Sequence, residues 1–422
     1  MKSKYSSLLI ALLLSVFTAY SQPISWVEQT SGVTTQLTSI SIVNSNHIWV
    51  CGYAGRVLRT TNGGATWVSV NAAPIPGTLD LHSIYAIDSV TALVAGSGTS
   101  SFLFRTSNGG ANWIQVFTET GGFINSVQMG NSFAGFMMGD PVGGRWSLWG
   151  TTTGGMTWDS STFYLPQSGS DAGWNNSFFF DVTAGVWFGT NNTRVYKSLT
   201  LTSWVTQPTT GQANSYAIWF NTPLTGFTGG TALLLTTNGG STWVNPPAAL
   251  PGTANLAGIT GFGLQYVVVR QSTDIYITAN NGVSWSTSYT ATAGNYRHIA
   301  KNRADNLTYF GVRTNGGISK GTLMVGITPN SSEVPNKFEL KQNYPNPFNP
   351  NTQIEFSIPK TGIVKLSVYD ALGREVNSLL NSELTAGNYR INFNASDLSS
   401  GTYYYKIISG DFVQTKKMLM IK

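Results

Sequence analysis

Carboxyl groups are the side chains of this sequence that could do hydrolytic chemistry. A glycoside hydrolase needs two carboxyl groups facing each other across a pocket, one as the acid and one as the base or nucleophile. Asp140 lies in Gly139-Asp140-Pro141, where a loop residue could reach a binding face. Most acidic residues are instead expected to bind the backbone of their own turns. The candidates outside repeated positions are Glu119, Asp140, Asp159, Asp171, Asp181 and Asp274.

The sequence contains no pattern typical of a metal or nucleophile site. The three histidines, His47, His82 and His298, are far apart in the chain, and there is no HxH, HExxH or CxxC motif. Calcium loops, GxSxG and phosphate-binding loops are also missing from the sequence. The single cysteine, Cys51, lies in a strand-like run with no histidine nearby, so we expect a small buried side chain. We therefore expect no metal and no cofactor.

Five tryptophans outside the repeats described below are a further candidate signal. Trp174 lies in Ala172-Gly173-Trp174-Asn175-Asn176 and could present an aromatic face to a sugar ring. Packing in a core accounts for the group at least as well, because large aromatic residues are mostly buried. The five are Trp146, Trp149, Trp174, Trp187 and Trp219.

The composition restricts the class of protein. Charged residues make up 10% of the 422 residues, aromatic residues 12% and hydrophobic residues 41%, which excludes a disordered chain. Beyond the N-terminus no apolar stretch reaches the roughly 18–20 residues of a spanning helix, so no integral membrane segment is expected in the mature chain. The net charge is +6, but no cluster of five Lys or Arg occurs, so nucleic-acid binding is not expected.

The N-terminus has the pattern of a secretory signal peptide. Residues 1–21 begin with Lys2 and Lys4, continue with an apolar core and end in Ala-Tyr-Ser. Cleavage is predicted between Ser21 and Gln22. The mature protein is therefore expected to leave the cytoplasm.

Residues 22–326 contain a repeat of about 40–50 residues, which is typical of propellers and solenoids. Five of the repeats carry a version of Thr-Thr-Asn-Gly-Gly-Ala-Thr-Trp, in which Asn-Gly and Gly-Gly can close a hairpin at positive φ. The sequence Lys-Ser-Leu-Thr-Leu-Thr-Ser-Trp, ending at Trp204, keeps only the position and the Trp. The hairpin positions are Asn62, Gly64 and Trp67; Asn108, Gly110 and Trp113; Gly155 and Trp158; Asn238, Gly240 and Trp243; and Asn280, Gly282 and Trp285.

Four short strands per repeat make one propeller blade. In the first repeat they include Thr38–Val43, His47–Gly52 and Arg56–Thr60. The last repeat lacks its Trp strand, whereas Ile24–Glu28 is a Trp strand with nothing before it. The sequence therefore predicts an all-β fold with a seven-bladed β-propeller, closed by the N-terminal strand in the last blade.

These hairpins resemble the Asp box of the BNR (sialidase-type) repeat, sortilin and photosystem II assembly factor propellers. Asn stands where the family usually has Asp, and Thr153 stands there in the third repeat. The box marks the fold and not an activity. A sialidase would also need three arginines and a Tyr–Glu pair, but Arg59 and Arg105 hold the same repeat position, which favours a structural role.

The composition changes after the propeller. Residues 327–335 are predicted to be a polar linker, and residues 336–422 have the alternating runs of a small Ig-like β-sandwich. These residues resemble the type A sorting domain of the type IX secretion system of Bacteroidetes and their relatives. The sorting motif residues are Pro345, Asn346, Pro347, Phe348, Asn349, Pro350, Gly373, Gly401, Tyr403 and Lys416. An Ig-like module that simply binds a ligand is the alternative.

The resemblance implies that the outer-membrane translocon reads the tail, with the protein passing through the periplasm to be released or anchored at the surface. The most favoured function is non-enzymatic binding of an extracellular glycan or protein, by loops at the mouth of the channel. A sialidase-like glycoside hydrolase is one alternative. An assembly factor like the photosystem propellers is another, although the export tail argues against it. A purely structural surface protein, which a featureless, blocked channel would favour, is the third.

Overall fold

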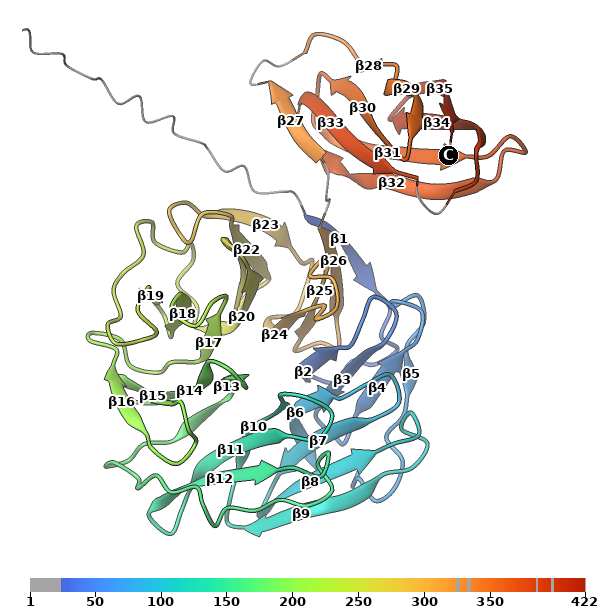
Figure 1. Ribbon diagram of the computed structural model, residues 1–422. Coiled ribbons are helices and arrows are strands. Elements are labelled where there is room, and N and C mark those ends of the chain that lie inside the picture. Colours follow the sequence, from blue (N-terminus) through green and yellow to red (C-terminus); the bar gives the residue numbers. More distant parts are fainter. Residues whose placement is uncertain (1–23, 324–326, 332–334, 385, 396–397, 422) are drawn as a thin grey trace, which may run out of the picture.

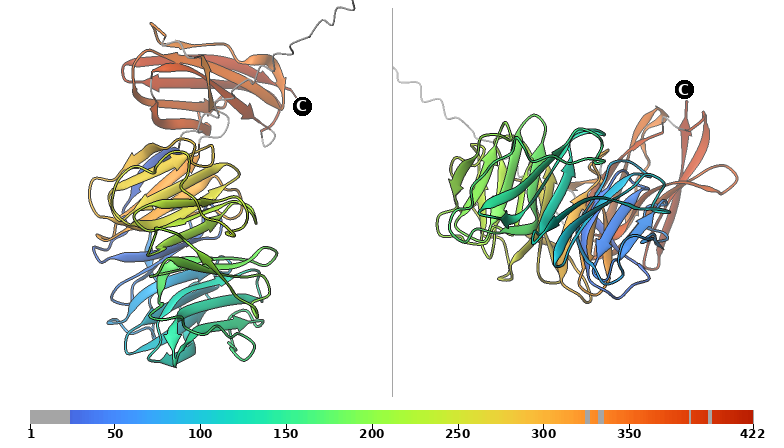
Figure 2. Two further views of the ribbon diagram at one scale, coloured as in Figure 1. Left: turned by 90° about the vertical axis from the view of Figure 1, so that its left-hand side faces the viewer. Right: turned by 90° about the horizontal axis from the view of Figure 1, so that it is seen from below.

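The structure is a computed structural model that describes residues 24–323, 327–331, 335–384, 386–395 and 398–421. These residues form strands and turns, and none of their segments is a helix that could cross a bilayer. Residues 24–323 fold into seven sheets around a central channel, which is a seven-bladed β-propeller (Figures 1 and 2). The predicted all-β class and blade number are confirmed. The predicted signal peptide and its cleavage site lie outside the described residues.

The blades follow one another along the chain, each sheet running from the innermost strand outwards. Blade 1 contains β2 (Leu37–Ile42), β3 (Ile48–Gly52), β4 (Val57–Thr60) and β5 (Val68–Ser69). Blade 2 contains β6 (Asp80–Ala86), β7 (Ala92–Ser97), β8 (Ser100–Thr106) and β9 (Ile114–Thr120). Blade 3 contains β10 (Ile124–Met129), β11 (Gly135–Val142) and β12 (Arg145–Thr151). Blade 4 contains β13 (Gly173–Asp181), β14 (Gly185–Thr190), β15 (Arg194–Ser198) and β16 (Val205–Pro208).

The remaining blades follow the same plan. Blade 5 contains β17 (Ala217–Phe220), β18 (Gly226–Gly229) and β19 (Leu233–Thr236). Blade 6 contains β20 (Leu256–Phe262), β21 (Gln265–Arg270), β22 (Asp274–Thr278) and β23 (Ser286–Thr290). Blade 7 contains β24 (Tyr296–Lys301), β25 (Thr308–Arg313) and β26 (Ile318–Leu323), completed by β1 (Ile24–Gln29). In blades 3 and 5 the fourth strand is reduced to the isolated bridges Gly150–Asp159 and Leu235–Val244.

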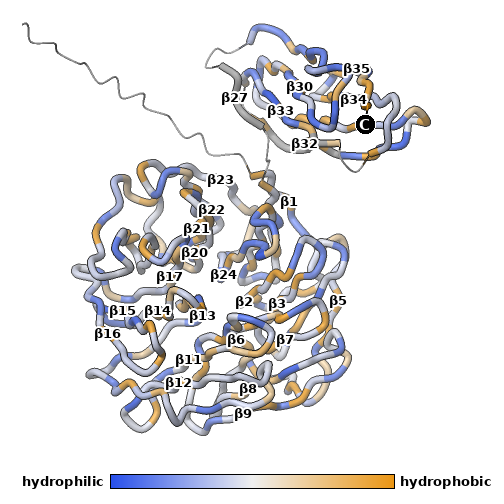
Figure 3. The backbone as a smooth tube through the Cα atoms, in the orientation of Figure 1, coloured by the Kyte–Doolittle hydropathy of each residue, from blue (hydrophilic) through white to orange (hydrophobic). Residues whose placement is uncertain are grey.

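The second strand of each blade is almost wholly buried, because the neighbouring blades cover both of its faces. Every residue of β3, β7 and β21 is buried, and these strands read as nearly continuous apolar runs. Figure 3 shows the apolar residues following the strands of the blades. The core is therefore a ring of clusters between blades and not a single central cluster.

The hairpins are held by side-chain acceptors. The Asn62 Oδ1 accepts the Thr66 N–H at 2.9 Å, and the Thr60 hydroxyl oxygen accepts the Gly64 N–H at 3.0 Å. In blade 3 the Thr153 hydroxyl oxygen replaces the amide and accepts the Thr157 N–H at 2.9 Å. Asn can stand in for Asp because the turn needs an acceptor oxygen and not a charge.

Cations on the third strands join three of the hairpins to the preceding blade. Arg105 donates to the Gly154 carbonyl at 2.9 Å, and Lys197 donates to the Gly239 carbonyl at 2.9 Å. Lys320 donates to the Gly63 carbonyl at 2.8 Å. These bonds explain why Arg59 and Arg105 occupy one repeat position: Arg59 donates to the Ser89 carbonyl of the next blade at 2.8 Å.

The N-terminal strand closes the ring as predicted. β1 is antiparallel to β26, with Ile24 opposite Leu323 and Gln29 opposite Ile318. Glu28 on β1 forms an ion pair with Arg313, whose side chain is 3% exposed. Ile24 and Leu323, which are 299 positions apart in the sequence, thus lie opposite each other in adjacent strands.

The C-terminal domain is a two-sheet β-sandwich of nine strands around its own apolar core (Figure 1). One part of the linker prediction is wrong: residues 327–331 form a strand that pairs antiparallel with β33, because their backbone completes the edge of that sheet. The strands are β27 (Ile327–Ser331), β28 (Glu339–Leu340), β29 (Tyr344–Asn349), β30 (Asn351–Ile358), β31 (Gly362–Tyr369), β32 (Glu375–Leu384), β33 (Gly387–Asn394), β34 (Gly401–Ser409) and β35 (Phe412–Met420).

Candidate functional site

The innermost strands β2, β6, β10, β13, β17, β20 and β24 form a ring around the channel. The edges of neighbouring inner strands are joined by side-chain hydrogen bonds and not by backbone pairing. The Ser41 hydroxyl oxygen accepts the Ala86 N–H at 3.0 Å, and the Ser83 hydroxyl oxygen accepts the Val127 N–H at 3.2 Å. Gln128 bonds both the Phe178 carbonyl and the Phe180 N–H, at 3.1 and 3.2 Å.

A bulge in blade 4 divides the channel. The register between β13 and β14 shifts between Gly173 and Phe178, and Asn176 has a φ of 61°. The Asn176 amide donates to the Thr38 and His82 carbonyls at 3.3 and 3.2 Å and accepts from the Ser39 hydroxyl at 3.1 Å. Blade 4 thereby contacts blades 1 and 2 across the channel. Asn176 lines the cavities on both sides of this plug.

The first cavity, which we name the Trp174 cavity, lies at the N-terminal ends of the inner strands and has a volume of about 190 Å³. The Trp174 and Tyr216 rings are 4.3 Å apart, tilted by 45°. The Trp174 Nε1 and the Arg297 Nε are buried without a hydrogen-bond partner among the described residues. The lining also includes Gln36, Tyr53, His82, Asn175 and Gln271.

The second cavity, which we name the Lys301 cavity, lies at the C-terminal ends of the same strands and also measures about 190 Å³. Burial and the nearby Arg303 lower the pKa of Lys301 to about 8, and burial lowers the pKa of His298 to about 4. The Arg303 guanidinium lies 4.4 Å from the Tyr85 ring centroid and donates to the Ile42 carbonyl at 3.0 Å. Neither cavity is lined by Asp or Glu in the described residues.

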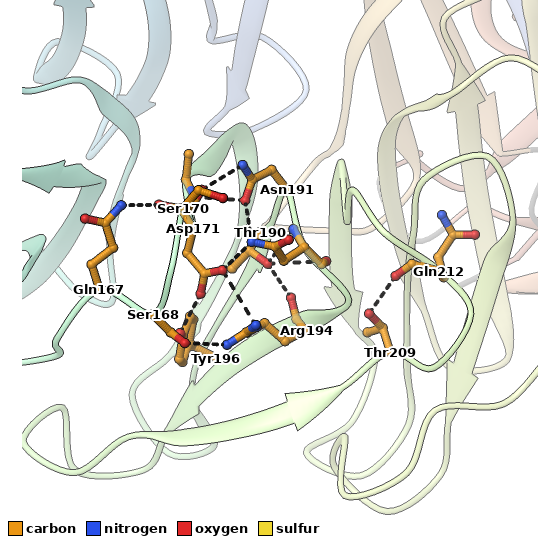
Figure 4. Close-up of polar contacts among 12 residues, drawn as sticks. Gln167, Ser168, Ser170, Asp171, Thr190, Asn191, Arg194, Tyr196, Thr209 and Gln212 are labelled. Carbon is orange, nitrogen blue, oxygen red and sulfur yellow. Dashed lines mark hydrogen bonds and ion pairs between the residues drawn. The ribbon is translucent and has the colours of Figure 1, made fainter.

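The candidate carboxylates serve local structure. Asp171, fully buried in blade 4, accepts the Tyr196 hydroxyl at 2.7 Å and lies 3.7 Å from the Arg194 Nε (Figure 4). Burial and the Asp171 carboxylate raise the pKa of Tyr196 to about 12. Asp159 and Asp181 bind hydroxyls of their own turns.

The other three candidates also lie apart. Asp140 accepts the Gly173 N–H at 2.7 Å at the base of the plug, and burial raises the pKa of its carboxyl group. Asp274 accepts the Thr290 hydroxyl at 2.7 Å, and Glu119 belongs to the outer strand β9. None of the six acids lines either of the two cavities, so neither cavity presents the facing carboxyl pair that a glycosidase needs.

The structure places two of the five candidate tryptophans in cores, as the packing interpretation predicted. Trp146 and Trp187 are 0% exposed and belong to cores between blades. Trp149 packs on Phe117. Trp174 and Trp219 line the two cavities.

The histidines and the cysteine take different positions. His82 lines the Trp174 cavity and His298 lines the Lys301 cavity. The His47 ring lies 3.0 Å from the Asn44 side chain in a turn. Burial raises the pKa of the Cys51 thiol to about 12, which is the opposite of what a nucleophile needs. No group of three His, Cys, Asp or Glu side chains that could hold a metal occurs in the described part of the chain.

The sorting motif residues mostly hold the C-terminal sandwich together. The Asn346 side-chain oxygen accepts the Leu419 N–H at 2.8 Å, and Phe348, 3% exposed, is opposite Met420 in β35. The Pro350 carbonyl accepts the Ala395 N–H at 2.9 Å. Gly373 turns at a φ of 80° between β31 and β32.

The rest of the motif lies on the last hairpin, which β34 and β35 form. Gly401 begins β34 opposite Met420. The Tyr403 hydroxyl donates to the Ser399 carbonyl at 2.9 Å, and Lys416 in β35 is opposite Tyr405.

Family models match segments in both parts of the chain. Residues 342–422 match the family model of the secretion system C-terminal sorting domain, and residues 21–135 match that of the photosynthesis system II assembly factor YCF48. Both resemblances drawn from the sequence are thereby confirmed. No curated protein matches the chain.

Solved structures similar to the propeller include YCF48 bound to a D1 peptide, with 13% identity and a TM-score of 0.57 over 71% of this chain and 97% of that chain. YCF48 from Cyanidioschyzon merolae has 17% identity and a TM-score of 0.57, over 70% and 98% of the two chains. The WD40 β-propeller domain of Doa1 has 9% identity and a TM-score of 0.56, over 71% and 97%. The sorting tail implies export by the type IX secretion system to the cell surface or the extracellular space, and the propeller has a fold that resembles YCF48.

Proposed function

We propose that this exported propeller is a non-catalytic protein that binds an extracellular glycan in the Trp174 cavity. The observation that carries the proposal is the pair of rings of Trp174 and Tyr216, whose centroids are 4.3 Å apart. Hydrogen-bonding side chains line the same cavity, and none of the described lining residues is a carboxylate. A pocket with aromatic walls and a few polar groups that fix orientation is the usual form of a ligand site.

The polar groups of this cavity suit the hydroxyls of a sugar. Gln36, Gln271 and Asn175 offer amide donors and acceptors. The buried Trp174 Nε1 and Arg297 Nε lack partners among the described residues, which is costly unless a ligand or water bonds them. A sugar ring combines an apolar face for the aromatic rings with hydroxyls that can satisfy these donors.

Three alternatives receive less support. A hydrolase requires a carboxyl pair at the bound sugar, and the described lining contains none. A purely structural role accounts for the blocked channel, whereas the Trp174 and Tyr216 rings and the amide side chains that line the cavity favour a ligand. A peptide ligand has one observation behind it, the D1 peptide bound to a similar propeller. Because that similarity shows the fold alone, it supports a peptide less than the cavity lining supports a sugar.

The test is a tryptophan-fluorescence titration of the full chain with oligosaccharides of the main extracellular classes. One class should change the fluorescence of the native protein, and the Trp174→Ala variant should bind it about tenfold more weakly or not at all. Trp149→Ala is the matched control, because Trp149 is also half-buried but packs on Phe117 away from both cavities. Equal weakening in both variants, or no binding of any class, would contradict the proposal.

A further inference from the structure

We infer that the Lys301 cavity is a second binding site, for an acidic sugar of the uronate type. This inference goes beyond the proposed function, because it concerns the opposite end of the plugged channel and a different ligand charge. Residues of all seven inner strands line this cavity, so every blade contributes to it. Asn176 closes it at the plug.

The cavity concentrates positive charge. Lys301 and Arg303 both line it, and neither forms an ion pair with a carboxylate among the described residues. Asp305, in the same loop, is exposed and uses its Oδ1 to accept the Leu307 N–H. Lys301 is partly buried and Arg303 is exposed, and Asp305 acts on the charge of Lys301 without forming an ion pair with it, so an anion from outside can complete the site.

The neutral polar groups add donors. Because the His298 Nδ1 accepts the Ile40 N–H at 3.2 Å, the proton of the neutral ring lies on Nε2. Ser41 and Ser83 each accept a backbone N–H, which leaves their hydroxyl hydrogens to be donated. The lining thus offers a carboxylate several donors besides the two cations.

The wall of the cavity favours a sugar over a peptide. An extended peptide would need free backbone groups along a strand edge. The edge amides of Ile40, Ala86, Val127 and Phe180 are already bonded to side chains of the neighbouring blade. Trp219 gives an aromatic surface for a ring, and a cavity of about 190 Å³ has room for one residue at the end of a glycan chain.

Arg303 also has a structural task, since it donates to the Ile42 and Ala86 carbonyls of blades 1 and 2. Lys301 is therefore the better residue to change. Its ammonium donates to the Asn306 side chain and lies 5.7 Å from the Trp219 ring centroid. Lys301→Gln removes the charge, and Lys301→Arg keeps it.

The experiment is isothermal titration calorimetry of the full chain with D-glucuronate, using D-glucose as the neutral counterpart. Glucuronate should bind, with glucose at least about tenfold weaker, and Lys301→Gln should raise the Kd for glucuronate about tenfold or more. Lys301→Arg should restore most of the binding. Lys197→Gln is the matched control, because Lys197 is also partly buried over a tryptophan but lies on the third strand of blade 4.

Several results would overturn the inference. They are an absence of glucuronate binding, equal binding of glucose, or an unchanged Kd in Lys301→Gln. Binding of an acetylated tripeptide with a free carboxyl end in place of glucuronate would also overturn the sugar assignment. Because Trp174→Ala should leave the glucuronate Kd unchanged, failure here is distinguishable from failure of the Trp174 site. If Trp174→Ala lost glucuronate binding while Lys301→Gln kept it, the uronate would lie in the Trp174 cavity and not in the Lys301 cavity.

Discussion

Removal of the Glu28 carboxylate should loosen the closure of the propeller. Glu28 lies on β1, which pairs with β26 and so completes blade 7. Its carboxylate pairs with Arg313 and accepts the Ser319 and Tyr289 hydroxyls, each at 2.8 Å. The Glu28→Ala variant removes all three interactions and leaves the polar groups of blade 7 and β23 behind.

The magnitude follows from burial. The Arg313 side chain is 3% exposed, so its charge would lose its only carboxylate partner among the described residues. Breaking a buried pair costs about 3–5 kcal/mol, but Glu28 is 36% exposed, so we expect about 2–3 kcal/mol. For a domain of this size that corresponds to a fall of about 3–5 °C in the melting temperature.

The assay is thermal unfolding of the full chain followed by circular dichroism and tryptophan fluorescence. Glu28→Gln should lose about half as much stability as Glu28→Ala, because the amide oxygen can still accept from Ser319. Glu119→Ala is the control, since Glu119 on the outer strand β9 has no ion pair in the described residues, and it should change stability by less than about 0.5 kcal/mol. If Glu28→Ala and Glu119→Ala had the same melting temperature, the stabilising role of Glu28 in the closure would be contradicted.

Two further predictions concern buried polar groups. Burial lowers the pKa of His298 to about 4, so the stability that this neutral ring contributes is present above the unfolded pKa of about 6.5 and is lost as the pH falls through 4. Urea unfolding should therefore show a smaller decline between pH 6.5 and 4 in His298→Asn than in the native protein, and parallel pH profiles would refute the buried ring. Asp171→Ala should cost about 2–3 kcal/mol, because the Tyr196 hydroxyl and Arg194 lose their acceptor inside blade 4. Chemical denaturation measures this loss, and a change below about 0.5 kcal/mol would contradict the network in Figure 4.

Local sequence signals predicted most of the propeller. The Asn-Gly-Gly hairpins end in a tryptophan at a fixed interval, and each turn needs only its own few residues to form. The unmatched strand at Ile24–Glu28 predicted the closure because the last repeat lacked the same element. The C-terminal domain has weaker strand signals: β32 has the mixed sequence of residues 375–384, and β29 contains two prolines, which disfavour strands.

The sequence predicted less of the two cavities than of the fold. Trp174 was recognised from an unusual local segment, but the plug depends on the φ of Asn176 and on acceptors in blades 1 and 2. Lys301 and His298 look ordinary in their own repeat. They become a site only when the ring brings seven inner strands together, and a pattern within one repeat carries no information about that convergence. The small polar residues at alternate positions of β2, Ser39 and Ser41, were the available signal.

A thermal-shift screen against polysaccharide classes tests the central claim most directly, with the full chain compared with Trp174→Ala and Trp149→Ala. A ligand at a hundred times its Kd adds about 2.7 kcal/mol to the stability of the native state, which is visible as a higher melting temperature. We predict that one glycan class raises the melting temperature of the native protein and of Trp149→Ala, but not of Trp174→Ala. No shift with any class, or the same shift in Trp174→Ala, would contradict glycan binding in the Trp174 cavity.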